Sequence, residues 1–138
     1  MCATLGSPPR GFILPASHAS GNPGENRLLP QTAGELDRAG IRPREIVADG
    51  GFQRGPTDDA FPDLTPGQIQ LSGRHETGSR RTRKRRARCR TGIEGRISHL
   101  KRGYRLRRSR LKGHDGMRTW TAWAILAYDL DTLAIRSR

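Results

Sequence analysis

One short stretch of the sequence carries residues that could bind a metal ion and phosphate side by side. It runs from Arg90 to Lys101 and reads Arg-Thr-Gly-Ile-Glu-Gly-Arg-Ile-Ser-His-Leu-Lys. In a helix, which turns by about 100° per residue, Arg90, Glu94 and Lys101 fall within an arc of about 40°. A carboxylate placed there can bind a divalent metal, and the two cations can bind phosphate. The alternative is a basic helix in which Arg90 and Glu94 form an ordinary ion pair one turn apart.

Asp49 is the second residue whose position suggests chemistry. It follows the apolar run Ile46-Val-Ala48, which predicts a short buried strand, and it precedes Gly50 and Gly51. Active sites of open α/β sheets lie at the carboxyl ends of strands, and glycines let a ligand approach the backbone. The alternative is that Asp-Gly-Gly is only a turn.

The elements that must position these residues alternate between strand and helix, which is typical of an α/β fold. Residues 1–10 show no periodicity, and we expect no structure there. An apolar run at 11–16 predicts a strand at the edge of a sheet, because Pro15 lacks an N–H. The remaining expected elements are a helix at 25–39, the strand at 46–48, a short helix around 56–61, a half-exposed strand at 68–72, a charged loop at 73–89, and helices at 90–104 and 119–134.

The last expected helix is the most apolar segment of the chain. Trp120, Trp123, Ala124, Ala127 and Leu130 recur at helical spacing, so we expect this stripe to pack against the core. Two acids near the end of the same helix, Asp129 and Asp131, are expected to lie at the surface or in salt bridges.

The positive charge of the chain is concentrated in one block. The formal net charge is +13, yet residues 1–73 carry six Lys and Arg against eight Asp and Glu. Residues 74–112 carry 17 basic and two acidic residues, whereas residues 113–138 are balanced. Such a block is expected for contact with a phosphate backbone, although an RNA-binding tail or an anionic-membrane patch would look similar. Tyr104 is the one aromatic residue in the block, which argues against base stacking on single strands.

Composition also bounds the class of protein. At 138 residues, with 33% hydrophobic and 28% charged residues, we expect one polar domain with a modest core and partial disorder. Cys2 and Cys89 are too few for a zinc site. No apolar run reaches the length of a membrane span and no signal peptide is recognisable, so we expect a cytosolic protein without a membrane partner.

The spacing Arg, three residues, Glu, six residues, Lys resembles the pattern around the last Glu of the DDE transposases. These are bacterial insertion-sequence enzymes with a ribonuclease H-like core. The family's pattern has a Tyr three residues before the Arg, where this chain has Ala87. The resemblance continues in the segments 11–18, 21–26, 47–52, 95–113 and 120–131.

The resemblance implies a truncated ribonuclease H-like fold, with an incomplete mixed sheet and flanking helices spanning residues 11–134. Within it, residues 74–89 are expected to form a basic, flexible insert. The resemblance further implies that Asp49 and Glu94 are catalytic carboxylates that bind Mg²⁺ or Mn²⁺. Cations placed to bind DNA phosphate are Arg90, Arg96, Lys101, Arg102 and Arg105.

The family's reaction is cleavage of a phosphodiester at a transposon end, followed by strand transfer into target DNA. Its two metal ions, about 4 Å apart, stabilise the attacking and leaving oxygens. The family's first catalytic Asp has no counterpart, since residues 1–10 contain no acid. We therefore expect a carboxyl-terminal piece of a transposase that binds DNA, is inactive alone, forms homo-oligomers and associates with the bacterial nucleoid. The alternatives are a non-catalytic basic nucleic-acid-binding protein and a poorly folding remnant.

Overall fold

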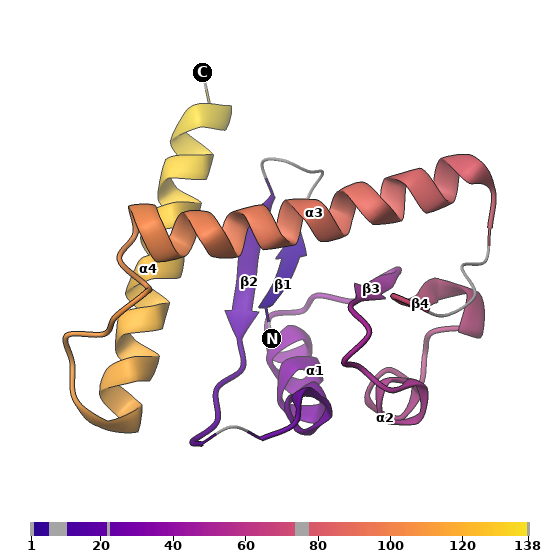
Figure 1. Ribbon diagram of the computed structural model, residues 1–138, viewed down its shortest axis with the longest axis horizontal. Coiled ribbons are helices and arrows are strands. Elements are labelled where there is room, and N and C mark those ends of the chain that lie inside the picture. Colours follow the sequence, from indigo (N-terminus) through magenta and orange to yellow (C-terminus); the bar gives the residue numbers. More distant parts are fainter. Residues whose placement is uncertain (1, 6–10, 22, 74–77, 138) are drawn as a thin grey trace.

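The computed structural model describes residues 2–5, 11–21, 23–73 and 78–137, and they form an α/β arrangement (Figure 1). The longest elements are two 24-residue helices, which cross near one end of the molecule. In chain order the elements are β1 (Cys2–Leu5), β2 (Phe12–Ala16), the 3-10 helix η1 (Glu25–Leu28), α1 (Leu29–Arg38), β3 (Ile46–Ala48), α2 (Arg54–Ala60), the 3-10 helix η2 (Pro66–Gln68), β4 (Ile69–Leu71), α3 (Arg80–Gly103) and α4 (Gly113–Arg136).

The strands form two separate pairs, so the expectation of a single mixed sheet was wrong for the described residues. β1 pairs antiparallel with β2, and β3 pairs parallel with β4. The first pair is joined by a short connection, which permits only antiparallel pairing, whereas α2 carries the chain back between β3 and β4. β1 was also unexpected, because we predicted no structure in residues 1–10; its backbone groups gain their partners from β2 rather than from any local pattern.

Two small cores hold the elements together. The first lies among α1, α2, β3 and β4 and includes Leu29, Phe52 and Leu71. β4 is buried at all three positions, so the half-exposed strand expected there was wrong. The second core joins β2, α3 and α4 through Ile13 and Leu100, together with residues of α4.

Helix α3 begins ten residues before the helix that we predicted, so most of the expected flexible basic insert is helical. Ser79 caps the helix by accepting a hydrogen bond from the Thr82 amide at 3.2 Å. Arg, Lys and Ala, which make up most of the first turns, are good helix formers. Residues 74–77 of the predicted insert lie outside the described residues.

Helix α4 turns a different face inward from the one predicted. Thr121, Ala124, Tyr128 and Thr132 are buried, and of the predicted stripe Ala124 alone is among them. Trp123 is 65% exposed and Leu130 is 55% exposed. On this inner face Ala124 and Tyr128 pack in one cluster with Ile13 of β2 and Leu100 of α3.

Candidate metal and nucleic-acid binding site

Helix α3 carries most of the candidate residues, and a buried ion pair fastens it to the β3–β4 pair. The Arg86 side chain is 6% exposed and donates from Nε to Glu45 Oε1 at 2.7 Å. It also donates to Gln70 Oε1 at 3.0 Å and to the Gly67 carbonyl at 2.9 Å. Burial raises the pKa of Glu45, but hydrogen bonds from Arg86 and Arg85 outweigh it and lower that pKa below its usual value. The first part of α3 therefore has a defined position relative to β3 and β4.

The other end of α3 is held to α4. The Tyr104 hydroxyl donates to Asp131 Oδ2 at 2.6 Å. Partial burial together with this hydrogen bond raises the pKa of Tyr104 to about 12. Asp129, next to it on α4, accepts from the Ile13 amide at 2.8 Å, so the two acids hold strand and helix rather than standing in salt bridges. Burial raises the pKa of Asp129.

The predicted line of Arg90, Glu94 and Lys101 lies within α3, so the three residues keep the expected arc. Glu94 and Lys101 are exposed, and Arg90 is half-buried. No ion pair within 4 Å joins Arg90 to Glu94 among the described residues, so the ordinary one-turn pair is not formed. The carboxylate is thus free to face a ligand together with the cations.

Asp49 follows the last residue of β3 and is exposed at the start of a tight turn. Its Oδ1 accepts a hydrogen bond from the Gly51 amide at 3.1 Å. A Cβ at position 51 would lie 2.1 Å from Glu25 Oε2 and 3.3 Å from Asp49 Oδ1, so a side chain there would displace the Glu25 carboxylate. The carboxylate that approaches this turn is therefore that of Glu25, from the first turn of η1.

The described residues do not assemble a complete metal site. Among residues 2–5, 11–21, 23–73 and 78–137, no three Asp, Glu, His or Cys side chains come together in a way that could hold an ion. Asp49 lies beside Glu25, whereas Glu94 stands on α3 eight residues beyond Arg86, or about 12 Å along the helix axis. Mg²⁺ needs several oxygen ligands, so this arrangement alone does not fit it.

The remaining predicted phosphate-binding cations occupy three different settings. Arg102 is exposed in the last turn of α3. Arg105 lies just beyond it with φ at 55°, a left-handed conformation that is unusual for a residue with a side chain, and its carbonyl accepts from Trp120 Nε1 at 3.1 Å. Arg96 is 4% exposed, unlike the other four cations, so it does not lie on the surface line that we predicted.

Sequence reasoning missed three features of the site. The buried role of Arg86 has no sign in the sequence, because it stands within a run of nearly identical basic residues. The approach of Glu25 to Asp49 joins residues far apart in the chain and had no signal either. The burial of Arg96 could have been suspected from its place two residues from Glu94, which puts it on the opposite side of the helix.

Comparisons with known proteins give one match. The family model described as transposase DDE domain matches residues 3–130 of the chain. No curated protein and no solved structure matches it. Within the described part of the chain, no helix is both long enough and apolar enough to cross a membrane.

Proposed function

The chain belongs to the transposase DDE-domain family, and from this membership we propose that it binds the backbone of duplex DNA through the exposed cations of α3 and of the segment that follows it. DNA transposition is the activity of this family. The observation that carries the proposal is α3 itself, a single 24-residue helix in which the basic block becomes an ordered surface. A rigid row of cations neutralises successive phosphates at little entropic cost.

In this proposal the line of Arg90, Glu94 and Lys101 is the face of α3 that meets DNA near the reactive phosphate. Arg90 and Lys101 neutralise the phosphate, and Glu94 and Asp49 are the carboxylates that this chain contributes to Mg²⁺ or Mn²⁺ binding. Both carboxylates are exposed, which supports the assignment. Arg102 and Arg105 extend the phosphate contact beyond the helix.

The chain alone does not cleave DNA in this proposal, because two carboxylates without a third bind the metal weakly. The α/β elements belong to a ribonuclease H-like fold, supported by the unit of α1 followed by β3. The protein acts in the bacterial cytoplasm on nucleoid DNA. We also propose that the chain forms homo-oligomers, which analytical sedimentation would test.

Fluorescence anisotropy with a labelled duplex tests the proposal. We expect binding that weakens steeply with salt, because several phosphates lose their counterions on binding. Lys101→Met should weaken binding, whereas Arg38→Met, which removes an exposed cation of α1 that is paired with Glu35, should leave it nearly unchanged. A flat salt response would exclude the electrostatic mechanism.

A nicking assay with transposon-end DNA and Mg²⁺ or Mn²⁺ tests the catalytic part. We expect no nicking by the purified chain. Robust nicking that is lost in Glu94→Gln and kept in Glu35→Gln would contradict the proposed inactivity and would establish Glu94 as catalytic.

The competing function is a non-catalytic nucleic-acid-binding protein, and the absence of a three-residue metal cluster among the described residues favours it. The two functions predict different results for metal binding by the carboxylate variants. If Mn²⁺ binding, measured by paramagnetic relaxation of water, is the same in Asp49→Asn and Glu94→Gln as in the wild type, the carboxylates have no metal role.

A further inference from the structure

Arg96 is a buried cation without a hydrogen-bond partner among residues 2–5, 11–21, 23–73 and 78–137. It is 4% exposed, and its Nε, Nη1 and Nη2 atoms are all buried without a hydrogen-bond acceptor. Such a group is costly, because it has lost its hydration and gained no compensating contact. Arg86, which is also buried on α3, has the hydrogen-bond acceptors that a buried guanidinium normally has. A carboxylate, an amide oxygen and a backbone carbonyl accept hydrogen bonds from it. Among the residues that the structure describes, none supplies an anion or another acceptor to the guanidinium of Arg96.

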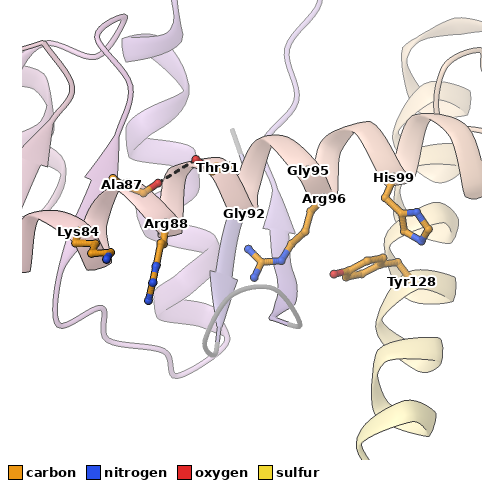
Figure 2. Close-up of a pocket in the computed structure, with 9 residues that line it drawn as sticks. All are labelled: Lys84, Ala87, Arg88, Thr91, Gly92, Gly95, Arg96, His99 and Tyr128. Atoms are coloured by element: carbon orange, nitrogen blue, oxygen red, sulfur yellow. Dashed lines mark hydrogen bonds between the residues drawn. The ribbon is translucent and has the colours of Figure 1, made fainter. Parts of the chain in front are cut away.

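Arg96 lines a hollow of about 780 Å³ that runs along α3 to Tyr128 of α4 (Figure 2). Lys84 and Arg88 line the same hollow, and Figure 2 shows Arg88 and Arg96 extending from the same side of the helix. None of the described residues that line it is acidic. The volume lies within the range of sites that bind small organic ligands.

The rest of the lining leaves room for a ligand near the helix backbone. Gly95 faces the hollow, and a side chain at this position would meet no atom within 4 Å. His99 and Tyr128 close one end, with their rings 6.1 Å apart in an edge-to-face arrangement. The Tyr128 hydroxyl donates to the Gly11 carbonyl at 3.2 Å, so the ring is held in place.

The hollow is distinct from the face that carries Glu94. Arg96 follows Glu94 by two residues, which rotates it by about 200° around α3 to the opposite side. Lys84, Arg88 and Arg96 follow one another at intervals of four and eight residues, so they form a row of their own. The two sets of cations on α3 thus face different directions, with Arg96 nearly opposite Glu94, Arg88 about 120° from it and Lys84 about 80° from it.

The geometry points to a second phosphate-binding site on α3, in which the exposed Arg88 and Lys84 hold a backbone phosphate of nucleic acid and Arg96 joins them when its buried guanidinium turns into the hollow that it lines. This inference rests on the proposed function in one respect, which is that DNA supplies the phosphate. Three cations around one hollow match the repeated charge of a phosphodiester chain better than a single carboxylate, which one guanidinium would neutralise. The planar guanidinium of Arg96 can donate two parallel hydrogen bonds to one phosphate. A single chain then contacts the DNA backbone on both sides of α3.

Arg96→Met tests the site, because methionine keeps much of the side-chain volume and removes the charge. We expect the free protein to melt at a higher temperature, since an unpartnered buried cation is gone. Inorganic phosphate should raise the melting temperature of the wild type and should leave that of the variant unchanged. Duplex affinity should fall about tenfold, the loss of one charge-assisted contact, and the salt slope should fall by about one.

Arg38→Met is the matched control, because it removes the same charge at an exposed position outside the hollow. Arg88→Met is the second variant. Arg88 is exposed, so its loss should weaken phosphate and duplex binding without affecting folding.

The outcomes separate the two proposals. If the wild type fails to bind duplex but phosphate still protects it through Arg96, DNA binding fails and the anion site stands. If the wild type binds duplex while Arg96→Met and Arg88→Met bind as tightly as Arg38→Met, the second site is wrong and DNA binding stands. A lower melting temperature for Arg96→Met, with no loss of phosphate protection, would show that the Arg96 guanidinium serves folding alone.

Discussion

Two neighbouring arginines pair with the same carboxylate, and we predict that only one of them stabilises the fold. Arg85 and Arg86 contact Glu45 at 2.5 and 2.7 Å, but the Arg85 side chain is 64% exposed and that of Arg86 is 6% exposed. Arg86→Met leaves the side-chain oxygen of Gln70 and the Gly67 carbonyl without their hydrogen-bond donor, and it removes the buried ion-pair partner of Glu45. Breaking a buried pair costs about 3–5 kcal/mol, whereas an exposed pair contributes only about 0.2–1 kcal/mol.

Urea denaturation followed by circular dichroism measures both losses. We expect Arg86→Met to lower the free energy of unfolding by about 3 kcal/mol or more and Arg85→Met by less than about 1 kcal/mol, with similar denaturant slopes. A double-mutant cycle with Glu45→Gln isolates the pair itself, and the coupling should be larger for Arg86 than for Arg85. Because an exposed pair is screened, added salt should diminish only the effect of Arg85.

Equal losses for the two variants would refute the reasoning. They would show that the burial of the Arg86 guanidinium makes no difference, and that α3 is held to β3 and β4 by something other than this network. A loss of cooperativity in Arg86→Met alone would instead support the network as the link between the two cores, since α3 contributes Leu100 to one core and its Arg86 binds Glu45 and Gln70 beside the other.

Three further predictions concern protonation and packing. The phenol of Tyr104 should ionise near pH 12 in an absorbance titration, and this step should be absent in Tyr104→Phe. Because the pKa is raised in the folded protein, the hydrogen bond to Asp131 stabilises the fold below pH 10, and this stabilisation is lost as the pH rises toward 12. Ionisation of Tyr104 at the usual pH of a tyrosine would contradict the hydrogen bond. The pKa of Glu45 is lowered in the folded protein, so its ionised carboxylate stabilises the fold above pH 4.5, and this stabilisation is lost as the pH falls through the folded-state pKa. In Glu45→Gln, the free energy of unfolding should therefore fall less steeply as the pH is lowered. An unchanged dependence on acid pH would show that Glu45 does not contribute to it. Leu29→Ala, at a fully buried position, should lower the free energy of unfolding by about 2–5 kcal/mol in thermal unfolding. Leu130→Ala, at a position that is 55% exposed, should lower it by less than about 0.5 kcal/mol. A large loss of stability in Leu130→Ala would mean that this face of α4 is covered.

Local pattern was sufficient for several elements of the chain. The helix ending near residue 39, the strand at 46–48 and the turn at Asp49 were predicted, because apolar spacing and glycine act over a few residues. The arc of Arg90, Glu94 and Lys101 needed only the geometry of a helix. Membership of the transposase DDE-domain family could also be predicted from the sequence, since it depends on residue types and their spacing.

Tertiary contacts decided the features that local pattern could not show. α3 begins at Arg80 although its first turns lack apolar periodicity, and the partners that hold Arg86 lie 41 and 16 residues away in the chain. The inner face of α4 is the one whose Ala124 and Tyr128 pack with Ile13 and Leu100, although the predicted apolar stripe is larger. Sequence by itself determined which residues can carry charge and which segments can be helical, because these depend on near neighbours. Only the fold decided that Arg86 has hydrogen-bond partners and that Arg96 has none within the described part of the chain, because burial and hydrogen bonding depend on segments distant in the chain.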